Sequence, residues 1–141
     1  MSEKTYAGDL SAKQAWEKLS DDPDAVLIDV RTDAEHTWVG GPDLSQLGKE
    51  ALCIQWQAYP GMDPNPDFID QVSSEVPSKD TAILYLCRSG IRSAHAAETM
   101  TANGFSQCFN IEDGFEGARD DDSHRGNVGG WKADGLPWLQ K

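Results

Sequence analysis

A cysteine and two arginines stand close together in the run AILYLCRSGIRSAHAAETM, residues 82–100. Cys87 ends an apolar segment, and Arg88 and Arg92 follow it within the next five residues. A cysteine thiolate is a strong nucleophile, and a guanidinium group binds an oxyanion through paired hydrogen bonds. These residue types at this spacing predict a nucleophilic cysteine that acts on a small anionic substrate.

The turn after Cys87 supplies further groups that attract an anion. Its backbone amides, over residues 88–92, can form a concave anion-binding nest, and the N-terminus of the helix expected next adds positive potential. With Arg88 and Arg92, these groups favour the thiolate form of Cys87 over the thiol. A buried core cysteine is the alternative interpretation, but the coincidence of loop, helix start and arginines favours a reactive one.

The distance along the chain from Cys87 to the second arginine separates two reactions. In cysteine-dependent phosphatases the phosphate-binding arginine would fall at position 93, which is Ser93 in this chain. Arg92 comes one residue earlier, so the loop should close more tightly. A tighter loop favours a sulfur atom carried on Cys87 over a tetrahedral phosphoryl group. A phosphatase or arsenate reductase is the less favoured alternative.

Strands that alternate with helices must position this loop. Apolar, strand-like runs are expected at residues 25–28, 51–56, 81–86 and 107–111, after an extended piece around Thr5 and Tyr6. Helical patterns cover residues 10–19, 65–76 and about 92–103, with a further short helix beginning at Thr32 or Asp33. This order predicts an α/β domain with a central, mainly parallel sheet flanked by helices. Ligands bind such sheets beyond the carboxyl ends of the strands, which is where Cys87 lies.

Individual residues indicate where the helices and the loops begin and end. Ser11 is a good N-cap for the first helix, and Gly104 is a good left-handed residue after the last one. The segment GGPDLSQLGKE, residues 40–50, is a loop by composition. The three prolines and one glycine of QAYPGMDPNPD, residues 57–67, indicate a long loop without regular structure.

Length and charge limit the classes of protein that fit. The 141 residues suit one domain over 1–141, with a core at about 8–117 and a tail at 118–141 that wraps the surface and docks Trp131 and Trp138. The formal net charge of −12 argues against nucleic acid and anionic membranes as partners. Without a signal-like leader or a long apolar run, the expected location is cytoplasmic.

The sequence gives less indication of a catalytic role for the other cysteines and for the histidines. Three cysteines are too few and too scattered for a disulfide framework or a zinc site. Cys53 and Cys108 lie in strand-like runs, so we expect both to be buried, and their part in redox chemistry stays open. His36, His95 and His124 have no partner at a spacing that indicates a general base. The acidic RDDDSH segment lacks the ligand pattern of a calcium loop.

Two segments together carry a family resemblance. LIDVRTDAE, residues 27–35, and LYLCRSGIRSAHAAETMTANGFSQCFNIEDGFEG, residues 84–117, resemble the rhodanese (sulfurtransferase) family in its single-domain form. The resemblance implies a three-layer α/β fold. It also implies an enzyme that takes a sulfane sulfur from a donor such as thiosulfate onto Cys87. The resulting persulfide would pass the sulfur to a thiophilic acceptor such as cyanide, without a metal or an organic cofactor.

The resemblance also implies roles for neighbouring residues. The substrate-binding loop would comprise Arg88, Ser89, Gly90, Ile91 and Arg92. Its amides would stabilise the persulfide, and its two arginines would bind the sulfonate oxygens of the donor. Three further residues would support the site, namely Asp29, Arg31 and Ser93.

The chain departs from the family pattern in two segments. EHTWVGGPDLSQLG, residues 35–48, lacks the usual histidine, and the insert ARDDDSHRGNVGG, residues 118–130, delays the closing tryptophan. The rim of the pocket is therefore altered. Together with the acidic surface, this keeps a second hypothesis open, in which the protein is a sulfur carrier that docks a sulfur-accepting protein.

Overall fold

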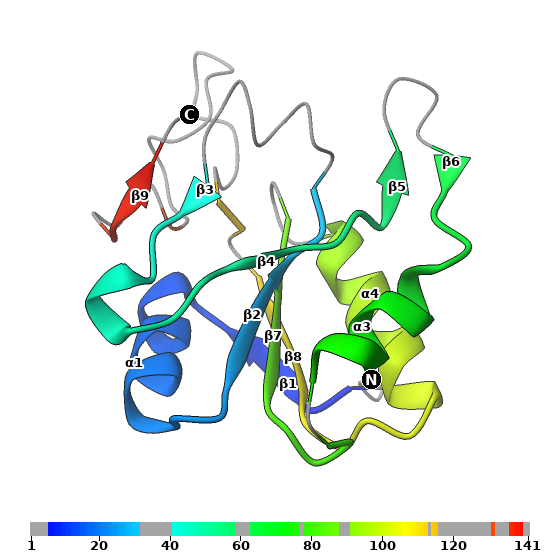
Figure 1. Cartoon of the computed structure of the whole chain (residues 1–141), viewed down its shortest axis with the longest axis horizontal. Helices are drawn as coiled ribbons and strands as arrows, with labels where there is room; N and C mark the ends of the chain where they lie inside the picture. Colours follow the sequence, from blue (N-terminus) through cyan, green and yellow to red (C-terminus); the bar gives the residue numbers. More distant parts are fainter. Residues whose placement is uncertain are drawn as a thin grey trace, which may run out of the picture.

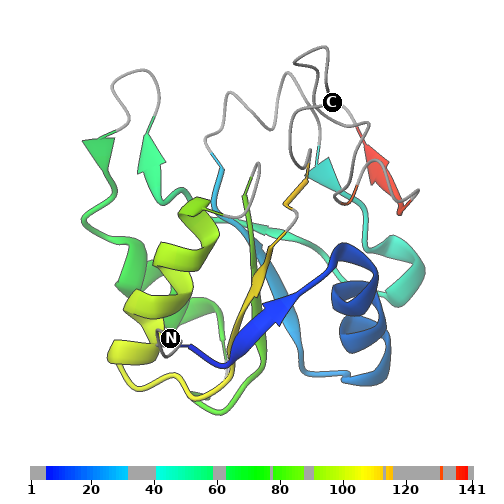
Figure 2. The same cartoon turned by 180° about the vertical axis from the view of Figure 1, so that it is seen from behind.

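The computed structural model describes residues 6–31, 41–58, 63–76, 78–87, 91–112, 114–115, 131 and 136–139. A central sheet lies between helices on both faces, with α1 on one side and α3 and α4 on the other (Figure 1). The same arrangement seen from behind places strand β1 between α1 and α4 (Figure 2). This three-layer α/β architecture confirms the predicted fold class.

The central sheet is parallel throughout its described pairings. Its strand order is β1-β8-β7-β2-β4, so the strand that leads into Cys87 lies in the middle. Its members are β1 (Gly8–Leu10), β2 (Val26–Asp29), β4 (Leu52–Cys53), β7 (Ile83–Leu86) and β8 (Cys108–Ile111). All four residues of β7 are buried, as expected for a strand covered by helices on both faces. The carboxyl ends of these strands share one edge of the sheet (Figure 1).

Three helices lie within the described ranges, and they begin close to where the sequence predicts them. They are α1 (Ala12–Asp21), α3 (Phe68–Glu75) and α4 (Ile91–Ala102). Ser11 caps α1 as predicted, and Gln14 completes a capping box by accepting from the Ser11 amide. After α4 the chain turns at Gly104, whose φ of +98° is the left-handed conformation predicted there.

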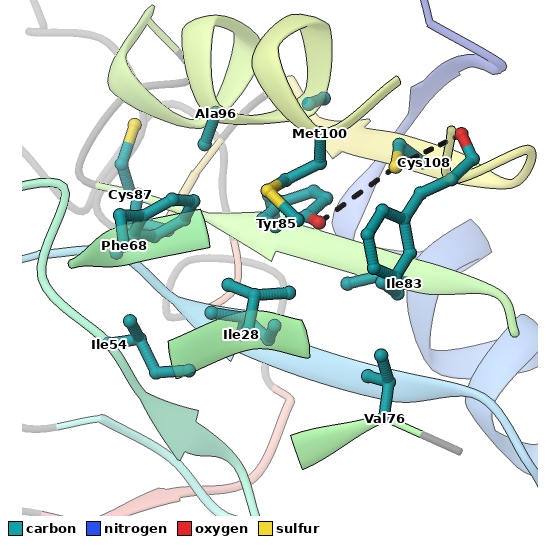
Figure 3. Packing of buried hydrophobic residues seen from close by; sticks show 14 residues of the cluster. Ile28, Ile54, Phe68, Val76, Ile83, Tyr85, Cys87, Ala96, Met100 and Cys108 are labelled. Carbon is teal, nitrogen blue, oxygen red and sulfur yellow. Dashed lines mark hydrogen bonds between the residues drawn. The ribbon is translucent and has the colours of Figure 1, made fainter. Parts of the chain in front are cut away.

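The sheet has a separate apolar core on each face. One core packs α3 and α4 on the sheet through Phe68, Val72 and Met100, and it includes Cys87 (Figure 3). The other core packs α1 on the opposite face through Ala12, Ala15 and Leu19. Trp131 is fully buried in this second core and Trp138 packs against it, so the predicted docking of both tryptophans is confirmed.

Two predicted loops contain short strands and a 3-10 turn, so those predictions were wrong in part. Residues 41–47 hold β3 (Gly41–Pro42), which pairs antiparallel with β9 (Trp138–Leu139), and the turn η1 (Ser45–Leu47). In the proline-rich segment, β5 (Gln57–Ala58) pairs antiparallel with β6 (Asp63–Pro64). A two-stranded ribbon tolerates Pro64 because a peripheral strand does not need every amide as a donor.

Three other predictions concern the first strand, the apolar run 51–56 and a short helix. Tyr6 lies in a bend and the first described strand begins at Gly8, so the extended piece predicted at Tyr6 was placed too early, while Thr5 lies outside the described residues. The apolar run 51–56 forms a strand only over its second and third residues. The short helix predicted from Thr32 or Asp33 lies outside the described residues. Among the residues that are described, no helix is long and apolar enough to cross a bilayer.

Candidate active site around Cys87

Cys87 lies at the carboxyl end of the central strand, directly after β7. Its side chain is 1% exposed, and its carbonyl accepts a hydrogen bond of 2.8 Å from the Phe115 amide. The Val30 amide donates to the carbonyl of Leu86 at 2.8 Å and so continues the pairing with β2 up to the cysteine. The backbone that carries the sulfur is thus held from two neighbouring segments.

The first turn of α4 places a hydroxyl group beside the sulfur. Ser93, the third residue of this helix, has its Oγ 3.3 Å from Cys87 Sγ. The same oxygen lies 2.5 Å from Oδ1 of Asn110 on β8, and all three side chains are buried. Because Ser93 belongs to the first turn, the sulfur lies near the positive end of the helix dipole. Ser93 was predicted as a supporting residue, and the structure brings it into contact with Cys87.

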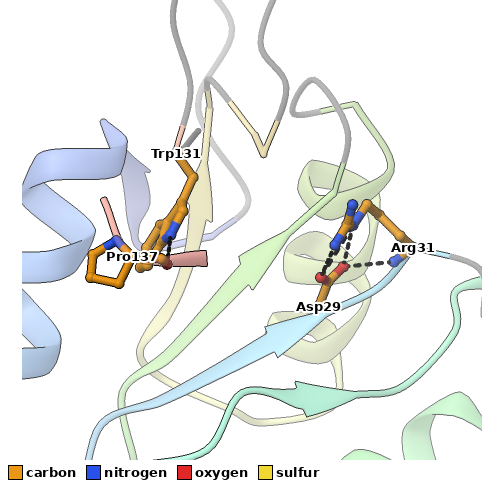
Figure 4. Close-up of polar contacts among 4 residues, drawn as sticks. All are labelled: Asp29, Arg31, Trp131 and Pro137. Atoms are coloured by element: carbon orange, nitrogen blue, oxygen red, sulfur yellow. Dashed lines mark hydrogen bonds and ion pairs between the residues drawn. The ribbon is translucent and has the colours of Figure 1, made fainter. Parts of the chain in front are cut away.

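Asp29 and Arg31 form a fully buried ion pair at the end of β2, next to the strand of Cys87. Arg31 donates from Nε to Asp29 Oδ1 at 2.9 Å and from Nη2 to Oδ2 at 2.7 Å, and its backbone amide donates to Oδ1 at 3.1 Å (Figure 4). Two parallel guanidinium bonds to one carboxylate fix both side chains in a single geometry. The pair therefore braces the interior of the protein, because neither side chain is exposed to solvent.

The brace also reaches the segment that holds the cysteine backbone. The Arg31 guanidinium carbon lies 4.4 Å from the centre of the Phe115 ring, within the range of a cation–π contact. Phe115 is fully buried, and its amide is the donor to the Cys87 carbonyl. Arg31 thus contacts the residue whose amide binds the Cys87 carbonyl, and the supporting role of Asp29 and Arg31 stays a prediction.

The predicted anion-binding loop is only partly visible. Arg92 is the second residue of α4 and is half-buried. Arg88, Ser89 and Gly90 lie outside the described residues, and the side chain of Ile91 is not described either. The roles of these residues in binding a substrate anion therefore stay predictions.

The two remaining cysteines differ from each other. Cys108 is buried as predicted, 3.8 Å from the hydroxyl of Tyr85, and burial raises the pKa of its thiol (Figure 3). Burial is also the main reason why the pKa of the Tyr85 hydroxyl is raised. Cys53 is exposed, so its predicted burial was wrong. It belongs to β4 at the edge of the sheet, where Leu52 and Ile54 on either side are more buried.

Sequence reasoning missed Asn110 and Asp9, which belong to the surroundings of Ser93. Asn110 is 4% exposed, and its Nδ2 donates to Asp9 Oδ1 on β1 at 3.1 Å. The signal available in the sequence was a polar residue inside the otherwise apolar run QCFNI. Among the described residues, no three His, Cys, Asp or Glu side chains come together in a way that suits a metal ion.

Known proteins resemble this chain in fold and in sequence. The crystal structure of Rv0390 from M. tuberculosis superposes with a TM-score of 0.89 at 46% sequence identity, covering 96% of this chain and 99% of that one. Rhodanese-like domain-containing protein 4, chloroplastic, of Arabidopsis thaliana is 34% identical over 131 residues, which are 92% of this chain and 25% of the plant protein. A protein of Allochromatium vinosum named Sulfurtransferase is 26% identical over 129 residues, covering 92% of each chain.

The sheet order, the cysteine at the end of the central strand and these relatives define the class as rhodanese-like sulfurtransferases. Within that class, residues 7–141 match the family described as the STR4 middle domain, and the chain belongs to this family.

Proposed function

We propose that the protein transfers a sulfane sulfur from a donor such as thiosulfate to a thiophilic acceptor such as cyanide, through a persulfide on Cys87. The observation that carries the proposal is the position of Cys87, at the end of the central strand and beside the first turn of α4. A helix N-terminus favours negative charge, so this position suits a thiolate, a persulfide anion or an anionic donor. The relative named Sulfurtransferase supports the same class of reaction.

The proposed reaction has two displacements at sulfur. The Cys87 thiolate attacks the outer sulfur of thiosulfate, a new S–S bond forms, and sulfite leaves with the electrons of the broken bond. Cyanide then attacks the outer sulfur of the persulfide, thiocyanate leaves, and the thiolate is restored. The attacking thiolate needs no separate base. Arg88 and Arg92 would bind the donor oxygens, and the amides of residues 88–92 would stabilise the persulfide.

Steady-state turnover tests the proposal. Purified protein is mixed with thiosulfate and cyanide, and thiocyanate is measured for the wild type, Cys87→Ser and Cys53→Ser. The proposal predicts turnover in the wild type and in Cys53→Ser, whose altered side chain lies at the sheet edge, and none in Cys87→Ser. Equal thiocyanate formation by Cys87→Ser would contradict it. Hydrolysis of an aryl phosphate without any sulfur transfer would favour a phosphatase instead.

A sulfur carrier is the second candidate, and the net charge of −12 is the observation that favours it. A strongly acidic surface suits long-range attraction to a basic partner protein. A carrier would accept one sulfur on Cys87 but release it slowly to cyanide, and a basic sulfur-accepting protein would accelerate the release in a salt-dependent way. The cytoplasmic location inferred from the sequence stays a prediction.

A further inference from the structure

The hydrogen bond to the Cys87 carbonyl comes from a residue outside the strands of the central sheet. Strand β8 ends at Ile111, and the Phe115 amide that donates to Cys87 follows a turn. At this turn the Gly114 amide donates to the Ile111 carbonyl at 3.0 Å, and Gly114 has a left-handed φ of +67°. The register of the strands alone does not fix this hydrogen bond, so the contacts that hold Phe115 also control it.

Phe115 is held in part by the C-terminal segment of the chain. The centre of its ring lies 6.0 Å from that of Trp138, with an interplanar angle of 81°. Two aromatic rings in this edge-to-face arrangement attract each other beyond the effect of the area they bury. Trp138 is thus, like Arg31, in contact with the residue whose amide binds the Cys87 carbonyl.

The segment that carries Trp138 is itself fastened to the rest of the protein. The Trp131 amide donates to the Gly114 carbonyl at 2.9 Å, and its indole Nε1 donates to the Pro137 carbonyl at 2.7 Å (Figure 4). The same carbonyl of Pro137 accepts the Asp43 amide at 2.9 Å, and the neighbouring strand β9 pairs with β3. Trp138 therefore reaches Phe115 from a segment that hydrogen bonds hold in place.

We infer that Trp138 is a positioning residue that acts through Phe115 and holds the backbone of Cys87 where sulfur transfer requires it. Cys87 directly precedes the predicted anion-binding loop, so the hydrogen bond to its carbonyl fixes the point where that loop begins. A small misplacement of a reacting group slows a reaction steeply. The inference rests on the proposed function, in which Cys87 accepts the transferred sulfur.

A role of Trp138 in stability alone makes a different prediction, and Trp16 on α1 distinguishes the two roles. Both indoles are half-buried and pack against the same core. The described aromatic partner of Trp16 is Trp131, at 5.8 Å between ring centres and again edge-to-face. Trp16→Ala is therefore a matched control for the loss of a half-buried indole from this core.

Amide hydrogen exchange, measured by NMR at Phe115 and Val30, tests the structural half of the inference. The Val30 amide is the reference because it donates to the Leu86 carbonyl from the other side of β7. Trp138→Ala should accelerate exchange at Phe115 about fivefold relative to Val30, within the range that one edge-to-face pair supports. Trp16→Ala should leave this ratio within about 1.5-fold of the wild type. An unchanged ratio in Trp138→Ala would overturn the inference.

The rate of sulfur loading on Cys87 tests the functional half. The protein is mixed with thiosulfate, quenched at set times and analysed by mass spectrometry, at a temperature at which circular dichroism shows every variant to be folded. Trp138→Ala should load sulfur about fivefold more slowly than the wild type, and Trp16→Ala should stay within about 1.5-fold of it. Equal slowing by the two variants would contradict a positioning role, because it would show an effect of stability alone.

Two further substitutions at position 138 separate the contact between the rings from the pairing of β9. Trp138→Phe keeps an aromatic ring that can meet Phe115 edge-to-face, so it should restore most of the loading rate. Trp138→Leu keeps an apolar side chain on β9 without the aromatic contact, so its rate should be close to that of Trp138→Ala. Loading by Trp138→Leu at the wild-type rate would refute the inference, since the ring contact would then have no role.

The two readouts separate this inference from the proposed function. If no sulfane donor loads Cys87 of the wild-type protein, the proposed function fails, and the exchange ratio by itself decides whether Trp138 holds the Cys87 backbone. If the wild type loads sulfur and neither readout responds to Trp138→Ala, the inference fails and the proposed function stands.

Discussion

The substitution Asp29→Asn should destabilise the fold strongly, because it removes the carboxylate from a fully buried ion pair. Arg31 donates to Asp29 through Nε, Nη2 and its backbone amide, at distances between 2.7 and 3.1 Å. Removing one partner of such a pair typically costs about 3–5 kcal/mol. The amide oxygen of asparagine can still accept one of these bonds, so we expect a loss near the lower end, about 3 kcal/mol. That is a large part of the about 5–15 kcal/mol that stabilises a typical domain.

Urea denaturation followed by circular dichroism measures this loss. Glu17→Gln, an exposed site on α1, is the matched change of carboxylate to amide and should stay within about 0.5 kcal/mol of the wild type. The double variant Asp29→Leu/Arg31→Met should be more stable than Arg31→Met alone, since it leaves no buried charge of the pair. A loss below about 1 kcal/mol for Asp29→Asn would refute the interpretation of the pair as a brace.

Three further predictions concern other parts of the molecule. Trp131→Ala should cost about 3–5 kcal/mol in the free energy of unfolding, since the ring is fully buried and its Nε1 donates to the Pro137 carbonyl; a loss under about 1 kcal/mol by urea denaturation would contradict the docking of this residue. In the native protein a maleimide should label Cys53, which is exposed, and label Cys108 only after unfolding; mass spectrometry of the peptides shows which is modified. Tyr6 has a pKa raised from 10.0 to about 12 in the folded state, so its contribution to stability is present below pH 10 and is lost as the pH rises toward 12. The free energy of unfolding of Tyr6→Phe should accordingly fall less steeply over that range than that of the wild type, and equal slopes would refute this assignment.

The fold could be predicted from the sequence because its signals are local. The apolar run that becomes β7, the capping serine at position 11 and the glycine at position 104 each act within a few residues of the chain. The alternation of strands and helices then leaves few arrangements besides a parallel sheet between helices. The location of Cys87 in a candidate site could be predicted as well, since parallel sheets bind ligands beyond the carboxyl ends of their strands.

The side chains around the Cys87 sulfur are brought together by strand pairing between distant segments. The register of that pairing could not be predicted from the sequence. Asp9 meets Asn110 only because β1 pairs with β8 in one particular register, across about a hundred residues of chain. Cys53 was misplaced for a related reason, since an apolar run does not reveal that its strand lies at the edge of the sheet. Sequence reasoning placed Cys87 at the end of the central strand, but it did not find Asn110 and Asp9, which are linked by hydrogen bonds to Ser93 beside the sulfur.

Locating the transferred sulfur on the chain tests whether Cys87 carries the proposed persulfide. The protein is incubated with thiosulfate, alkylated to trap any persulfide, digested, and analysed by mass spectrometry for the peptides of Cys53, Cys87 and Cys108. We expect one additional sulfur on the Cys87 peptide, and cyanide should remove it when it is added before alkylation. Sulfur found on another cysteine while Cys87 remains unmodified would contradict this proposal.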